Sequence, residues 1–284
     1  MISSREARTH RRVFTTIHYI MLIIIALIVL VPFLWMLSSS LKGSGIMTEV
    51  PPRWIPEKAF WSNYGEVLFE HKFIRYSINS VYISVTAALG QLLTCSLAGF
   101  AFARMKFPGR NLLFSLLLAT MMIPIQVMII PEFLIMLKLG WVDHPLSPAL
   151  IVPSWLAGAF GTFMLRQFFM TIPKDLEDAA RMDGCNIFGI YWRIFLPLAG
   201  AALATLFIFT TMTAWNDLLR PILYLSSQER WTLTIGLANF TRQYDVNENL
   251  KMAGSLFTLA PLIILYIFTQ RYFVRGITLS GLKG

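Results

Sequence analysis

Six long apolar stretches, separated by shorter polar segments, run along this chain of 284 residues. They cover approximately residues 17–37, 77–103, 111–137, 149–169, 194–218 and 253–273. An α-helix needs about 20 apolar residues to cross the hydrocarbon core of a bilayer, and each stretch reaches that length. The pattern predicts an all-α membrane protein with six transmembrane helices.

Two of these stretches carry features that predict how their helices behave. The stretch at 111–137 contains Pro124 and Pro131, which predicts a kinked or broken helix. Small residues recur every four positions in the stretch at 77–103, at Thr86, Gly90, Thr94 and Ala98. Such a row lets a second helix approach closely.

The first apolar stretch has two interpretations. A cleaved signal peptide is one, because small residues follow at Ser38–Ser40. The stretch is longer than the apolar region of most signal peptides, which favours a retained helix. We therefore divide the chain into residues 1–76, comprising an N-terminal arm, the first helix and an external segment, and a transmembrane core of residues 77–284.

The polar loop at about 171–197 has a strong local design. Pro173 suits the first position of a helix, acidic residues fill the early turns, and Gly184 offers a left-handed stop. These signals predict a helix of about 11 residues, roughly 16 Å long. Glu177 precedes Arg181 by four residues, the favourable spacing for an ion pair on a wet helix surface.

The same loop resembles the EAA loop of the membrane-spanning permease subunits of bacterial ABC importers. The matching positions are Asp178, Ala179, Ala180, Gly184, Ile194, Leu196 and Pro197. The family pattern has Glu where this chain has Asp178, so the charge is kept on a shorter side chain. The alternative is an amphipathic helix that lies on the membrane surface.

Further segments resemble the carbohydrate branch of these permeases. They are Ala214–Asp217, Gln270–Gly276 and Leu282–Gly284. The resemblance implies a type I permease fold with a cytoplasmic EAA coupling helix, and a function in the import of a sugar or oligosaccharide. The alternative is import of a polyol or a glycerol phosphate ester.

The resemblance also implies partners and a coupling site. A second permease would complete a heterodimer, two ATP-binding subunits would hydrolyse ATP, and an extracytoplasmic binding protein would deliver the substrate. The residues implied to couple to the ATPase are Glu177, Asp178, Ala179, Ala180, Asp183 and Gly184. The two alanines give a smooth patch that a partner's groove could approach closely.

Polar and aromatic residues within the spans are candidates for lining the translocation path, because polar groups are costly in hydrocarbon. Gln91, Gln126 and Trp155 are these candidates. An interhelical hydrogen bond is an equal alternative for both glutamines, and interfacial anchoring is the alternative for the tryptophan. Glu132 and Asp217 lie near the outer ends of their spans, where water reaches them.

Composition and charge agree with a membrane protein. Hydrophobic residues make up 56% and charged residues 14% of the chain, outside the range of soluble domains. The net charge of +9 could suggest nucleic acid, but in a membrane chain it reports topology. With six spans the whole excess falls on the face that carries both termini and the EAA-like loop. That face is predicted to be cytoplasmic, in a bacterial inner membrane.

No catalytic chemistry stands out in the sequence. There is no P-loop motif for ATP, and Cys95, Cys185 and the four histidines have no metal-ligand spacing. We therefore expect a transport subunit that is not an enzyme and binds no cofactor or metal itself. An ion-coupled transporter or an intramembrane enzyme would need ionisable or nucleophilic groups deep in the spans, and none is visible.

Overall fold

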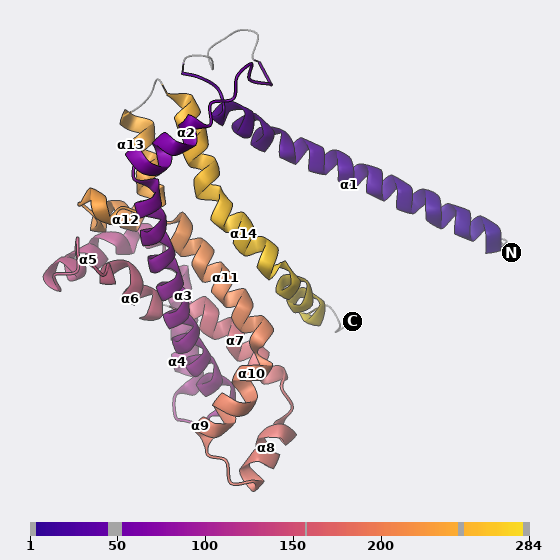
Figure 1. The fold of residues 1–284 in the computed structure, drawn as a ribbon. Helices are drawn as coiled ribbons and strands as arrows, with labels where there is room; N and C mark the ends of the chain where they lie inside the picture. The colour runs from indigo at the N-terminus through magenta and orange to yellow at the C-terminus, as the bar shows by residue number, and fades with distance from the viewer. Residues whose placement is uncertain (1–3, 45–52, 157, 244–246, 281–284) are drawn as a thin grey trace. The chain divides into compact units, whose positions relative to one another are not determined.

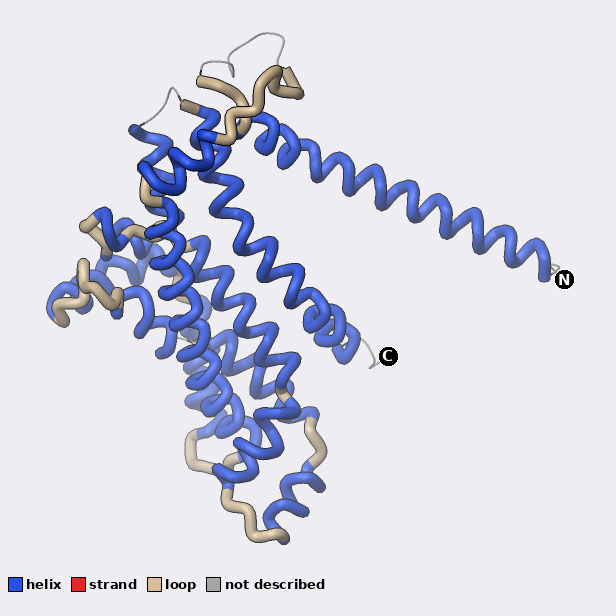
Figure 2. Tube along the Cα trace, viewed as in Figure 1, coloured by secondary structure: helices blue, strands red, loops and turns tan. Residues whose placement is uncertain are grey.

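The computed structural model describes residues 4–44, 53–156, 158–243 and 247–280, and every regular element within these ranges is helical (Figures 1 and 2). In chain order these elements are α1 (Ser4–Ser40), α2 (Ser62–Gly65), η2 (Glu66–Glu70), α3 (Phe73–Arg104), α4 (Arg110–Ala119), η3 (Thr120–Met122), α5 (Ile125–Lys138), α6 (Pro148–Leu156), α7 (Ala159–Thr171), α8 (Lys174–Met182), α9 (Ile187–Ile190), η4 (Tyr191–Phe195), α10 (Leu196–Leu198), α11 (Gly200–Asn216), α12 (Leu219–Tyr224), η5 (Gln228–Arg230), α13 (Leu233–Gln243) and α14 (Glu248–Ser280). The predicted all-α class is confirmed. The terminal motif at 282–284 lies outside the described residues.

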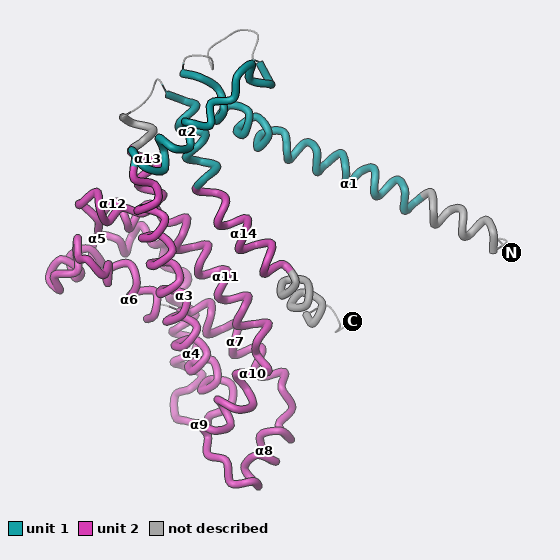
Figure 3. Tube along the Cα trace, in the orientation of Figure 1, with its two compact units in different colours: residues 1–71, 240–257 teal, residues 72–239, 258–284 magenta. Residues whose placement is uncertain are grey.

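The chain forms two compact units, residues 1–71 with 240–257 and residues 72–239 with 258–284 (Figure 3). In the first unit, α1 has the length and apolar composition of a membrane span over Phe14–Ser40. Its end is fixed by the Asn63 amide, which donates to the carbonyls of Ser40 at 2.8 Å and Lys42 at 2.9 Å. The Lys42 ammonium lies over the Trp35 ring, 4.0 Å from its centroid.

Helix α3 is the central element of the second unit, and α6, α7 and α11 pack along it. The core between them is apolar and aromatic, with Phe100, Phe169 and Phe195 meeting edge to face. Close packing of such rings contributes to the association of these helices. This core lies at the end of α3 nearest to α8.

The close packing predicted for α3 is present, but its buried face is rotated from the predicted row. Ala87, Ala88, Cys95 and Gly99 are buried, whereas the predicted small residues are half-buried at the margin. Gly90 accommodates the Trp155 indole, which would overlap a Cβ at that position. A Cβ on Gly99 would lie 3.0 Å from the backbone nitrogen of Arg166, so α3 and α7 are in backbone contact there.

The predicted break in the third span is confirmed. The segments Arg110–Met122 and Ile125–Lys138 meet at an angle of 101°. Pro124 lies at the bend with an extended ψ of 138°, because proline has no N–H for the helical ladder and clashes with the preceding turn. Pro131 lies inside α5 without ending it.

The fourth predicted span corresponds to α6 and α7, which qualify together as one span over Pro148–Thr171. The fifth is bent, and its segments Ile187–Leu198 and Gly200–Asn216 meet at 76°. The fifth therefore begins seven residues before the predicted start at 194. Four helices of the described chain qualify as spans alone, and six spans result if each bent pair counts as one.

Candidate functional site

Helix α8 forms in the predicted polar loop and is nine residues long. Asp175 and Glu177 lie in its first turn, where their negative charges interact favourably with the positive end of the helix dipole. Pro173 precedes the helix with an extended ψ of 140°, so it flanks the first position and does not occupy it as predicted. The helix is therefore two residues shorter than the sequence indicated.

The end of α8 is fixed by Gly184, as predicted. Its φ of 80° is left-handed, a conformation that glycine adopts without steric cost. The Cys185 amide donates to the carbonyl of Ala180 at 2.9 Å, and the Gly184 amide donates to that of Arg181 at 3.0 Å. This pair of bonds is the Schellman arrangement, which satisfies the last helical carbonyls and stops the helix.

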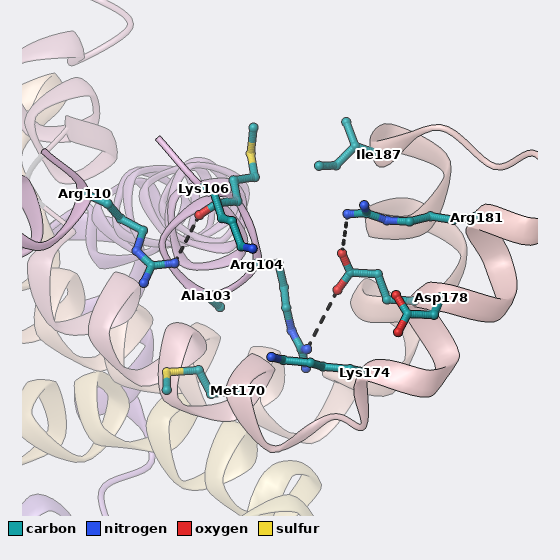
Figure 4. Close-up of a pocket in the computed structure, with 11 residues that line it drawn as sticks. Ala103, Arg104, Lys106, Arg110, Met170, Lys174, Asp178, Arg181 and Ile187 are labelled. Atoms are coloured by element: carbon teal, nitrogen blue, oxygen red, sulfur yellow. Dashed lines mark hydrogen bonds and ion pairs between the residues drawn. The ribbon is translucent and has the colours of Figure 1, made fainter. Parts of the chain in front are cut away.

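Glu177 faces its own chain. Only 7% of the residue is exposed, although the sequence placed it in an ion pair on a wet surface. The predicted pair with Arg181 is present, with Nη2 and Oε1 2.6 Å apart. The second carboxylate oxygen, Oε2, lies 3.7 Å from Nη1 of Arg104, at the end of α3 (Figure 4). Sequence analysis did not single out Arg104.

Arg104 joins several elements through one buried guanidinium. Its side chain is 5% exposed. Nη2 donates to the carbonyl of Phe169 at 2.6 Å and also to that of Ile172, at the end of α7. The guanidinium carbon lies 4.9 Å from the centroid of the Phe195 ring, in the next span. The guanidinium thus satisfies carbonyls that a helix end leaves free, and it also compensates the buried carboxylate.

The other face of α8 is turned outward. Asp178, Ala179, Asp183 and Gly184 are exposed. Ala180 is buried against the aromatic core, so the two alanines do not form one outward patch as predicted. Met182 beside them is 88% exposed, a large apolar side chain without cover in this chain. Six candidate coupling residues therefore divide into four that face outward and two, Glu177 and Ala180, that anchor the helix.

A cavity of about 700 Å³ lies between α8 and the turn that follows α3 (Figure 4). Its charged lining residues are Arg104, Lys106, Arg110, Lys174, Glu177, Asp178 and Arg181. Five cations face two carboxylates, so the cavity has a positive potential. The space also separates α8 from the turn between α3 and α4.

A second cavity, of about 470 Å³, is lined by residues of α3, α6, α7, α11 and α12. Gln91 lines it, as do the hydroxyl residues Ser154, Thr210 and Thr213. Phe160 and Phe209 add two aromatic rings. Amide, hydroxyl and aromatic groups around one space are suited to a polar solute with apolar faces.

Three charged residues cluster at one end of this second cavity. Arg220 pairs with Glu132, the closest atoms being 3.3 Å apart, and its backbone amide donates to Oδ1 of Asp217 at 3.3 Å. Asp217 and Arg220 line the cavity. The sequence placed both carboxylates near span ends. It did not mark Arg220 as a cavity residue, because Arg220 is only three residues after Asp217, in a segment that resembled the end of a span.

The two remaining path candidates lie elsewhere. The indole N–H of Trp155 donates to the carbonyl of Thr86 at 3.0 Å, and the ring covers Gly90, so this residue joins α6 to α3. Gln126 is exposed in the first turn of α5, beside the break at Pro124. Neither residue lines the second cavity.

Asp143 organises a turn far from α8 in sequence. Its carboxylate accepts from the amides of Ser226 at 3.2 Å and Ser227 at 3.0 Å, and pairs with Arg230 at 3.1 Å. Partial burial raises the pKa of this carboxyl, but the hydrogen bonds from Ser227 and the charge of Arg230 outweigh it, so the pKa is below its ordinary value. Asp143 also has a positive φ of 52°.

In the part of the chain that the structure describes, no three His, Cys, Asp or Glu side chains come together as a group that could hold a metal ion. Cys95 and Cys185 are free thiols. The Cys95 thiol is buried and donates to the carbonyl of Gly158 at 3.2 Å, so it belongs to the contact between α3 and α7.

Known proteins resemble this chain over most of its length. The sequence model of a family described as binding-protein-dependent transport system inner membrane component matches residues 95–279. The arabinooligosaccharides transport system permease protein AraQ of Halalkalibacterium halodurans is 42% identical over 206 residues, which are 72% of this chain and 73% of that protein. The sn-glycerol-3-phosphate transport system permease protein UgpE of Yersinia pestis is 33% identical over 268 residues, 91% and 94% of the two chains.

A solved structure has the same architecture. It is a chain of a bacterial ABC transporter involved in the import of the acidic polysaccharide alginate. The TM-score is 0.80 at 26% sequence identity, and the match covers 96% of this chain and 99% of that one.

Proposed function

Because this chain belongs to the family of binding-protein-dependent transport system inner membrane components, we propose that it forms part of the translocation path for a sugar or oligosaccharide in an ATP-driven importer. The observation that carries the proposal is the position of the EAA-like motif. It begins on the short helix α8, and Asp178, Ala179, Asp183 and Gly184 are exposed there. The similarity to the arabinooligosaccharides transport system permease protein AraQ supports the substrate class.

The chain requires partners in this proposal. The sequence has no P-loop, so two ATP-binding subunits supply the energy, and the chain itself is not an enzyme and binds no cofactor. A second permease completes the path, and an external binding protein delivers the solute. The complex lies in a bacterial inner membrane with both termini, and α8, in the cytoplasm.

The outward face of α8 is the proposed contact with an ATP-binding subunit. Asp178 supplies a charge, Ala179 allows close approach, and Met182 supplies an apolar side chain that this chain leaves uncovered. Closure of the ATPases then moves α8 as a rigid element, and the spans on either side of it follow. The second cavity then opens to one face of the membrane and closes to the other.

The second cavity is the proposed part of the path. Gln91, Ser154, Thr210 and Thr213 can exchange hydrogen bonds with sugar hydroxyls, and Phe209 can pack on a sugar face. Weak, repeated contacts of this kind suit a solute that must also leave. Trp155 and Gln126 take no part in this proposal, because one joins helices and the other lies outside the cavity.

A glycerol phosphate ester is the second candidate solute. The similarity to the UgpE protein favours it, and so does the presence of Arg220 at the cavity. However, Arg220 is paired with Glu132 and lies beside Asp217, so the three groups carry a net negative charge when ionised. Such a cluster repels an anionic solute, and we therefore favour an uncharged sugar.

The proposal is tested by purifying the tagged chain in mild detergent from native membranes, identifying its partners by mass spectrometry, and measuring ATP-dependent uptake after reconstitution. We expect a P-loop ATPase and a second permease to co-purify. Asp178→Lys should lower uptake about tenfold or more, since a reversed charge at an interface typically costs several kcal/mol. The control is Glu229→Lys, also a charge reversal at an exposed residue, beside the start of α3 and not beside its end, where α8 lies. A chain that purifies alone, with no ATPase, would contradict the proposal.

A further inference from the structure

The carboxylate of Glu177 is shared by two arginines that differ in what else they hold. We infer that Arg104 is a positioning residue that transmits the movement of α8 to α3 and α7, whereas Arg181 only supports α8 itself. The inference rests on the proposed function, because it concerns how the ATP-driven movement enters the spans.

Of the two arginines that bind Glu177, Arg104 is the one that contacts more than one helix. It is the last residue of α3, and its guanidinium contacts the carboxylate of Glu177 on α8 and the carbonyl of Phe169 on α7. The carbonyl of Ile172, in the segment leading to α8, is bound as well. A displacement of α8 that keeps these contacts intact must therefore move the ends of α3 and α7 together.

The geometry of this contact makes it stiff. A guanidinium is planar, and its donors have fixed directions, so it cannot follow one acceptor without changing its angle to the others. The guanidinium carbon also lies over the Phe195 ring, 4.9 Å from the ring centroid. Only 5% of the Arg104 side chain and 9% of the Glu177 side chain are exposed, so little water is available to replace a broken contact.

Arg181 provides an internal comparison. Its Nη2 is closer to the same carboxylate, at 2.6 Å, but it lies one turn along the same helix. Its side chain is 54% exposed, so water can replace the contact. Loss of either arginine removes one cation from Glu177, but only loss of Arg104 removes the polar contacts that join α8 to the ends of α3 and α7.

The remaining charges around Glu177 do not substitute for Arg104. Lys106, Arg110 and Lys174 line the same cavity, and Asp178 faces it from α8 (Figure 4). Among the described residues, Glu177 forms ion pairs with Arg104 and Arg181 and with none of these three cations. Ala180 adds an apolar contact between α8 and the core, which resists separation but has no fixed direction.

The test compares Arg104→Gln, Arg104→Lys and Arg181→Gln in the complete importer reconstituted in vesicles. Uptake and ATP hydrolysis are measured on the same preparations, so that solute moved per ATP is obtained. Arg104→Gln should lower this ratio about tenfold while hydrolysis continues, an effect within the range of known couplings between sites. Arg181→Gln should change it less than about twofold, and Arg104→Lys should restore part of the loss.

Assembly is checked by the yield of the complex on size exclusion. If Arg104→Gln fails to assemble, Glu177→Gln replaces it, because this variant keeps the bonds from Arg104 to Phe169 and Ile172. It should lower the ratio of uptake to hydrolysis in the same direction. The inference is overturned if Arg104→Gln and Arg181→Gln move the same amount of solute per ATP while the wild-type importer still works. Where Glu177→Gln replaces Arg104→Gln, the same comparison is made between Glu177→Gln and Arg181→Gln. Failure of ATP-dependent uptake in the wild-type complex would instead contradict the proposed function.

Discussion

Two carboxylates, Glu177 and Asp143, each hold together segments that are far apart in sequence. Glu177 joins α8 to the end of α3, and Asp143 joins the turn before α6 to residues 226–230. The Glu177–Arg181 pair is predictable because four residues separate its members on one helix. The pair with Arg104 is not, since its members are 73 positions apart in the sequence and only the packing of α3 against α7 brings them together.

Asp143→Asn should destabilise the purified chain at neutral pH. The pKa of Asp143 is lowered in the folded state, so its contribution is present above the unfolded value of about 3.9 and is lost as pH falls through the folded value. Asparagine tolerates the positive φ but loses the charge. We expect a loss of about 1–2 kcal/mol, or a few degrees in midpoint.

The measurement is thermal unfolding in detergent at pH 7 and pH 3.5. The difference between the variant and the wild type should shrink at the lower pH. Asp175→Asn, at an exposed residue of α8, is the control and should change the midpoint little at pH 7. An Asp143→Asn midpoint equal to that of the wild type at both pH values would contradict the assignment.

At the scale of elements, two of the predicted spans are bent, and the two bends differ in how well the sequence predicts them. The break at Pro124 could be predicted, because proline leaves a direct signal in the sequence. The bend between Leu198 and Gly200 could not, because the apolar run continues through it. The inward face of α3 was also misjudged, since long apolar helices have no polar side to mark their orientation.

Gly99→Ala and Gly200→Ala should have opposite effects on stability. A Cβ at Gly99 lies 3.0 Å from the Arg166 backbone nitrogen and 3.2 Å from the Thr162 carbonyl, so α3 and α7 must separate slightly, at a cost of about 1–3 kcal/mol. Gly200 begins α11 in open space, where alanine favours the helix by up to about 1 kcal/mol. Thermal midpoints of the two purified variants test this, and a Gly99→Ala variant as stable as Gly200→Ala would contradict the close contact.

At the scale of the whole molecule, α3 separates the two ends of the second unit. Near its start, the Asn79 amide donates to the carbonyls of Glu229 and Trp231, and at its end Arg104 pairs with Glu177. A helix of 32 residues is about 48 Å long, more than the thickness of a bilayer with its headgroups. We therefore expect α8 and the segment at 226–230 to lie on opposite sides of the membrane.

Cysteine labelling checks this topology. Asp183→Cys and Ser226→Cys are each introduced into a Cys185→Ser background, where Cys95 remains buried. A membrane-impermeant maleimide should label Ser226→Cys in spheroplasts, and Asp183→Cys only after the membrane is permeabilised. The background variant without either cysteine serves as the blank. Labelling of both positions before permeabilisation would contradict the six-span arrangement.

Arg104 binds α7 through the carbonyls of Phe169 and Ile172, and carbonyls are the same whatever side chains those residues carry. A substitution at position 169 or 172 therefore leaves an acceptor for Arg104 in place, whereas a substitution at position 104 removes the donor to both carbonyls and one cation from Glu177. For protein engineering, a loop of residues 171–197 transplanted between permeases would arrive without its partner. The functional unit to exchange is discontinuous, and it includes the last residue of a helix that ends 67 positions earlier in the sequence.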